Sequence, residues 1–119
     1  MIRQEVYDHP VAFTAFLQWH ITERKRALIE SKLHARTRYL TVVLEDIHKS
    51  HNASAVLRTS ECFGVQDLHI IEKEHEYSLH PHISSGSARW IDLHHYNQPG
   101  IDNTQACLTS LKNQGYQVL

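Results

Sequence analysis

Residues 39–72, YLTVVLEDIHKSHNASAVLRTSECFGVQDLHIIE, decide the fold. Residues 39–47 are almost continuously apolar and rich in β-branched side chains, which is typical of a strand buried on both faces of a parallel sheet. A helix is expected over 53–63, after a short polar loop. Residues 67–72 predict a second strand. Strand, helix and strand together form a βαβ unit, whose crossover is expected to be right-handed.

The ends of this helix are marked by residue type. Asn52 is a predicted N-cap, and Gly64 stands where a glycine commonly follows a helix. The helix is expected to turn an apolar face inward. That face comprises Ala53, Val56, Leu57 and Phe63.

The flanking sequence extends the alternation of strands and helices. Strands are predicted over 90–93 and 116–119, and Asp102 is expected to cap a helix over 103–114 between them. Upstream, helices are predicted over 8–20, with Asp8 as N-cap, and over 22–37, unless the two form one bent element. The expected fold class is α/β, an open and mostly parallel sheet with flanking helices.

Length and composition limit the possible classes. A chain of 119 residues suffices for one core, and 41% hydrophobic with 21% charged residues indicates a globular protein. Cys62 and Cys107 are too far apart for a disulfide framework or a cysteine zinc site. The sequence contains no apolar run of about 20 residues and no signal core, so we expect a cytoplasmic protein without a membrane span.

Charge divides the chain into two segments. Residues 1–40 carry a balance of +3 and residues 41–119 a balance of −4. This division predicts a basic helical extension over 1–38, whose cations can follow a phosphate backbone, and an α/β domain over 39–119. The alternative is an ordinary solvated helix face. The candidate RNA-binding cations of the extension are Arg24, Lys25, Arg26, Lys32, Arg36 and Arg38.

Eleven histidines are an unusually high number for this length. Their spacing matches no HExxH motif and no Cys/His ligand set. We predict no metal site, and a histidine-rich surface is the simpler interpretation. A histidine metal site is kept as a weaker alternative.

Three segments are expected at the carboxyl ends of the strands or on the following helix, where open α/β sheets bind ligands. They are the loop from Glu45 to Asn52, the serine-rich loop 84–87, and Arg58. Each also has a structural interpretation: an N-cap for Asn52, a plain turn for the serines, and a surface group for Arg58. The four glycines form no phosphate loop or dinucleotide fingerprint.

Residues 40–59, LTVVLEDIHKSHNASAVLRT, resemble the first motif of the SpoU/TrmH family. These are RNA ribose 2′-O-methyltransferases of the SPOUT class, which have a knotted α/β fold. Residues 21–24, ITER, and 84–90, SSGSARW, resemble two further family segments. The resemblance covers about residues 20–95 and is greatest to the branch that methylates a guanosine in the tRNA D-loop. Asp46 and Ser50 depart from the Asn and Pro of the family motif.

The resemblance implies roles for individual residues. Arg58 matches the catalytic arginine, Asn52 the asparagine that orders the site, and Glu45 a glutamate that orients Arg58 or the loop. The resemblance also implies S-adenosylmethionine as cofactor, bound in a C-terminal knot that we expect to lie outside this chain. It further implies that the protein is a homodimer. Further RNA-binding candidates are Lys49, His51, Ser85, Ser87 and Arg89.

The expected function is S-adenosylmethionine-dependent 2′-O-methylation of a ribose in RNA, most simply a tRNA D-loop guanosine. The chain ends as its last expected strand begins, so the 119-residue fragment alone is expected to be inactive. The alternative is a non-catalytic RNA-binding or subunit-interaction module, a truncated relative of these enzymes.

Overall fold

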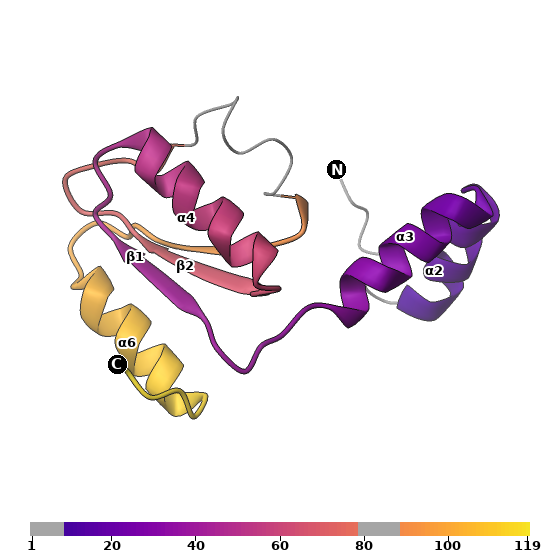
Figure 1. Ribbon diagram of the computed structural model, residues 1–119. Coiled ribbons are helices and arrows are strands. Elements are labelled where there is room, and N and C mark those ends of the chain that lie inside the picture. The colour runs from indigo at the N-terminus through magenta and orange to yellow at the C-terminus, as the bar shows by residue number, and fades with distance from the viewer. Residues whose placement is uncertain (1–8, 79–88) are drawn as a thin grey trace. The chain divides into compact units, whose positions relative to one another are not determined.

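The computed structural model describes residues 9–78 and 89–119 (Figure 1). Two compact units divide the chain, Met1–Ala35 and Arg36–Leu119. The boundary lies within three residues of the one expected from the sequence, at 38/39. Among the described residues, no helix is both long and apolar enough to span a bilayer.

The first unit contains two separate helices, α2 (Pro10–Trp19) and α3 (Glu23–His34). Pro10 at the first helical turn favours the start of α2, and its N-cap is His9, without a side-chain bond. Asp8, the expected cap, lies outside the described residues. Thr22 caps α3 by accepting a hydrogen bond from the Lys25 amide. Neither helix has a buried residue.

The second unit is built on a parallel sheet, in the order β1 (Val42–Glu45), β2 (Asp67–Ile71), β3 (Asp92–Tyr96). Helix α4 (Ser50–Cys62) connects β1 to β2, and α6 (Asn103–Asn113) follows β3. This confirms the expected open parallel sheet with flanking helices.

Two of the strand predictions need correction. Residues 39–41 lie outside β1, and β1 is only half-buried because it pairs with β2 alone. Full burial belongs to β2, which has a neighbour on each side and all five residues buried. The third strand is Asp92–Tyr96 and begins two residues later than the predicted 90–93.

Helices α4 and α6 cover opposite faces of the sheet (Figure 1). On one face, Leu57 of α4 packs with Leu68 and Ile70 of β2. On the other, Cys107 and Leu111 of α6 pack with Ile71. Alternate side chains of β2 thus enter the two halves of the core.

Helix α4 departs from its predicted ends. It begins at Ser50 with Lys49 as N-cap, so Asn52 lies inside the first turn and is not the cap. Phe63, expected to face inward, is 78% exposed because it follows the last helical residue. Gly64 has φ 74° there, as the expected glycine after a C-cap requires.

The predicted fourth strand over 116–119 is absent from the structure. Asp102 caps α6 by accepting from the Gln105 amide at 3.0 Å, as expected, and Gly115 with φ 93° ends it. The Tyr116 ring then packs beside Ile71, and its hydroxyl donates to the Arg38 carbonyl. This anchors the turn against the domain without a strand ladder to β1.

Candidate functional site

The parallel strands bring their carboxyl ends to one edge of the sheet. Glu45 ends β1, Glu72 follows β2 directly, and Tyr96 ends β3. The Glu72 amide donates to the Tyr96 carbonyl at 3.0 Å and extends the pairing by one step. The loops after all three strands border this edge, which is where open α/β sheets commonly bind ligands.

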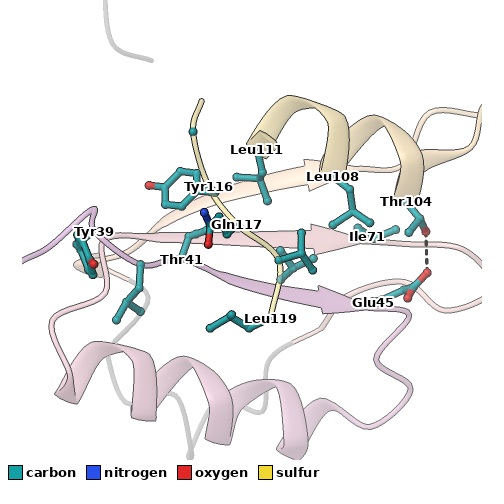
Figure 2. Close-up of a pocket in the computed structure, with 14 residues that line it drawn as sticks. Tyr39, Thr41, Glu45, Ile71, Thr104, Leu108, Leu111, Tyr116, Gln117 and Leu119 are labelled. Atoms are coloured by element: carbon teal, nitrogen blue, oxygen red, sulfur yellow. Dashed lines mark hydrogen bonds between the residues drawn. The ribbon is translucent and has the colours of Figure 1, made fainter. Parts of the chain in front are cut away.

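Glu45 links three elements at this edge. Its Oε1 accepts from Thr104 Oγ1 of α6 at 2.6 Å (Figure 2). The same oxygen pairs with Lys73 Nζ at 2.6 Å. The bond from Lys73 is the main reason that the pKa of Glu45 is lowered. Among the described residues no bond joins Glu45 to Arg58, so its contacts favour the orientation of the loop over that of the arginine.

Arg58 and Asn52 lie on the solvent side of α4. The helix buries Ala53, Ser54 and Leu57, and this turns Arg58 outward. Within the part of the chain that the structure describes, the Arg58 guanidinium has no hydrogen bond and no ion pair. A cation in this position is available to an anionic ligand.

Helical geometry relates Arg58 to the other candidates on α4. His51 precedes it by seven residues, so both side chains lie on one stripe about 10 Å apart along the axis. Asn52 precedes it by six residues and lies on a different side of the exposed surface. His51, Asn52 and the N-cap Lys49 are all exposed. The first turn and Arg58 therefore form one open surface without direct contact between Asn52 and Arg58.

The structure separates the cations of the sequence patch into two groups. Arg24 and Lys25 are exposed on α3, with Arg26 paired to Glu30 at 3.2 Å. Lys32 also lies on α3 and is partly buried. In the second unit, Arg36 and Arg38 bind residues of their own domain.

Arg36 is held inside the second unit. Only 7% of its side chain is exposed, and its guanidinium donates to the carbonyls of Glu61 and Val65 and to the Gln66 side chain. Arg38 is more exposed and bridges Asp67 and Asp92 at the start of β2 and β3. Arg36 therefore holds the turn after α4, and Arg38 neutralises the acidic ends of two strands.

The remaining candidates are only partly described. Ser85 and Ser87 lie outside the described residues, with the rest of the predicted serine loop. Arg89 is described and exposed. Sequence reasoning missed Lys73, Thr104 and His75, which all contact Glu45 or Asp46. Their positions after β2 or at the start of α6 were the available signal.

Two hollows border the sheet. The larger, about 840 Å³, lies between β1, α6 and residues 115–119 (Figure 2). A smaller one of about 560 Å³ lies between the loops after β2 and β3 and is lined by Glu72, Lys73 and 97–103. Residues 9–78 and 89–119 contain no group of three or more His, Cys, Asp or Glu side chains arranged to hold a metal ion.

A buried histidine of the sheet stacks on an exposed one. His69 of β2 is 5% exposed, stacks on His94 at 4.6 Å between ring centroids, and finds no hydrogen-bond partner for Nδ1 among the described residues. Burial and the nearby His94 lower the pKa of His69. Burial opposes ionisation of Asp67, but hydrogen bonds from His94 and Arg38 outweigh it and hold its pKa below the usual range.

We expect the second unit to lose stability on acidification below about pH 6.5. His69 stays neutral in the folded state at a pH where the unfolded chain takes up a proton, so acid favours unfolding. One such proton gives a slope of at most about 1.4 kcal/mol per pH unit. The measurement is urea unfolding between pH 8 and 5. His69→Leu should flatten the dependence and exposed His51→Leu should preserve it; an unchanged slope in His69→Leu would disprove the assignment.

Comparison with known proteins identifies the family. The model of the SpoU rRNA Methylase family matches residues 39–119. A tRNA (guanosine(18)-2′-O)-methyltransferase of Borreliella burgdorferi is 44% identical over 99 residues, which are 83% of this chain and 43% of that protein. The enzyme of the same name from Thermus thermophilus is 40% identical over 72 residues, 60% of this chain and 37% of that protein.

A solved structure agrees with the sequence comparison. The crystal structure of the A. aeolicus TrmH/SpoU tRNA modifying enzyme matches with a TM-score of 0.68 and 27% identity, over 80% of this chain and 46% of that one. The chain thus spans less than half the length of these relatives. The βαβ unit of residues 39–72, its parallel sheet and the family match over 39–119 place this chain in the SpoU rRNA Methylase family.

Proposed function

We propose that this chain forms the RNA-side part of a tRNA ribose 2′-O-methyltransferase that acts on a D-loop guanosine. The observation that carries the proposal is Arg58, an outward cation on α4 without an internal partner in the described structure. The relatives from Borreliella and Thermus, named as guanosine-18 2′-O-methyltransferases, support the choice of substrate.

The chemistry explains why an unpaired arginine suits this role. A ribose 2′-hydroxyl is a weak nucleophile, and negative charge develops on its oxygen as its proton passes to the surrounding water. A guanidinium binds two oxygens of a phosphate through two parallel hydrogen bonds, and its charge stabilises a developing alkoxide. We assign Arg58 both contacts, with Asn52 ordering the start of α4 and Glu45 holding the adjacent loop through Lys73 and Thr104.

S-adenosylmethionine supplies the methyl group in this proposal, but the acidic side chains that line the two hollows are already engaged within the domain. Binding the donor requires free polar groups for its ribose hydroxyls and amino-acid end. In the larger hollow, Glu45 is already bound to Lys73 and Thr104. In the smaller one, Asp102 caps α6, and Glu72 accepts from the Tyr77 amide. We therefore place the donor outside residues 9–78 and 89–119 and assign no step to it here.

Helix α3 is the proposed contact to the RNA backbone. Within residues 9–78 and 89–119 the exposed side chains of Arg24 and Lys25 have no hydrogen-bond or ion-pair partner, and the exposed Arg26 pairs with Glu23 and Glu30 of its own helix. Surface pairs of this kind are weak, so a phosphate can replace the glutamates. Lys49, His51 and Arg89 are proposed as further contacts, whereas Arg36 is assigned to the fold. A homodimer in the cytoplasm completes the proposal.

Replacing Arg24 and Lys25 with alanine should weaken tRNA binding by the full-length protein and reduce its salt dependence. Each lost phosphate contact lowers the slope of log affinity against log salt by about 1. The measurement is tRNA titration between 50 and 200 mM salt. The double variant Lys112→Ala/Gln114→Ala on α6 is the control. An unchanged slope in Arg24→Ala/Lys25→Ala would remove α3 from the RNA contact.

The second candidate function is a non-catalytic RNA-binding module. The observation that favours it is that Glu45, Glu72 and Asp102, the carboxylates lining the two hollows, already accept hydrogen bonds from their own domain. It predicts salt-dependent tRNA binding by the full-length protein without methyl transfer. Transfer of a methyl group to tRNA would exclude it.

A further inference from the structure

We propose that Asp46 is a positioning residue that joins the loop after β1 to the loop after β2 and thereby sets the start of α4. It would act on Asn52 and Arg58 through the backbone, without touching the substrate. The inference rests on the proposed function for its effect on catalysis. Its structural part stands on the contacts of Asp46 itself.

The backbone at Asp46 has an unusual conformation. Its φ of 48° is the only positive value outside glycine among residues 9–78 and 89–119. Aspartate tolerates this left-handed region better than most residues, but still at some cost in free energy. The Asp46 amide donates to the Ile71 carbonyl at 2.8 Å, so the bend begins while the chain is still attached to β2.

The bend directs the carboxylate into three successive amides. Asp46 Oδ1 accepts from the backbone N–H groups of Lys73, Glu74 and His75 at 3.2, 2.9 and 2.9 Å. Consecutive N–H groups that converge in this way form a nest for an anion. These bonds, that from the His75 amide foremost, lower the pKa of Asp46 to about 2.

Side chains join the same two loops a second time. The second oxygen, Asp46 Oδ2, lies 3.1 Å from His75 Nδ1. The His75 ring in turn meets the His48 ring edge-on at 4.4 Å between centroids. The segment 46–48 is therefore held against 73–75 at both of its ends.

The contacts between residues 46–48 and 73–75 form a junction directly before α4, and its effect follows from this position. His48 is followed directly by Lys49, the N-cap of α4, and Asn52 lies in the first turn. Leu57 keeps α4 in the core when the junction is lost, and the junction sets the direction in which the helix leaves β1. Loss of the junction should loosen the first turn and change the approach angle of Asn52 and Arg58 to a ligand.

Asp46→Ala and Asp46→Asn, made in the full-length protein, test whether the side-chain acceptor and the left-handed backbone of Asp46 hold the two loops together. Alanine removes every acceptor and disfavours the left-handed backbone. Asparagine keeps the acceptor Oδ1 and tolerates that backbone. Hydrogen exchange of the 73–75 amides should accelerate about tenfold or more in Asp46→Ala and return close to wild type in Asp46→Asn.

Catalysis gives the second readout. A misplaced site lowers the rate by about tenfold to a hundredfold. In Asp46→Ala we expect this loss in kcat with little change in KM, and recovery in Asp46→Asn. Because Asp46 acts through Arg58, Arg58→Ala should cost less in the Asp46→Ala background than in wild type.

The outcomes distinguish this inference from the proposed function. If Asp46→Ala exchanges its 73–75 amides as slowly as wild type, or if its methyl transfer is as fast as wild type, the positioning role is wrong. Additive effects of Asp46→Ala and Arg58→Ala would also overturn it. Absence of methyl transfer in the wild-type protein would instead refute the proposed function, and with it the catalytic effect, while the exchange rates would still decide the junction itself.

Discussion

Arg58→Ala in the full-length protein is expected to lower kcat for methyl transfer to tRNA by about a hundredfold to a thousandfold, the usual effect of removing one group that stabilises developing charge. The side chain is exposed and lacks an internal partner in the described structure. The free energy of unfolding should therefore change little. A large kinetic loss without a loss of stability is the pattern expected of a group that contacts the RNA.

Two further variants sharpen this result. Arg58→Lys keeps the charge but loses the planar donor pair, so it should recover only part of the rate. Lys112→Ala removes an exposed cation of α6 and should leave the rate unchanged. A wild-type rate in Arg58→Ala would show that the assigned role is wrong.

Arg36→Ala should have the largest effect on stability and destabilise the second unit by about 2–3 kcal/mol, since it removes the donor to two backbone carbonyls and one partner of a partly buried ion pair. Its guanidinium lies 3.9 Å from Glu61 Oε1 and satisfies the carbonyls of Glu61 and Val65. Alanine would leave both carbonyls without this donor. The measurement is urea unfolding, with the midpoint as readout.

Arg24→Ala is the matched control for Arg36→Ala. Both arginines belong to the same basic stretch of sequence, but Arg24 is exposed on α3. Arg24→Ala should leave the unfolding midpoint unchanged and weaken tRNA binding. An Arg36→Ala variant of wild-type stability would contradict the assignment of Arg36 to the fold.

The sequence predicted the strand–helix–strand unit because its signals are local. The apolar run of β2, Gly64 after α4 and Asp102 before α6 each act within a few residues, and the structure confirms all three. Burial of β1 could not be predicted in the same way, because it depends on which strands lie on either side. The strand predicted over 116–119 did not form for a related reason: Tyr116 packs beside the cluster of the distant Ile71, and its hydroxyl donates to the Arg38 carbonyl.

The candidate site shows the same division between local and distant signals. The spacing of α4 placed Arg58 on a helix, and the structure shows which side faces solvent. The partners of Glu45 and Asp46 are 27 to 59 residues away in sequence, so no local pattern revealed them. Arg36 and Arg24 look alike in a basic run, and only the tertiary structure separates a buried arginine from an exposed one.

Transfer of a labelled methyl group from S-adenosylmethionine to unmodified tRNA by the full-length protein tests the central claim most directly. The account predicts label on the ribose 2′-oxygen of a D-loop guanosine and its loss in Arg58→Ala. Label on a base, or tRNA binding without any transfer by wild-type protein, would contradict it.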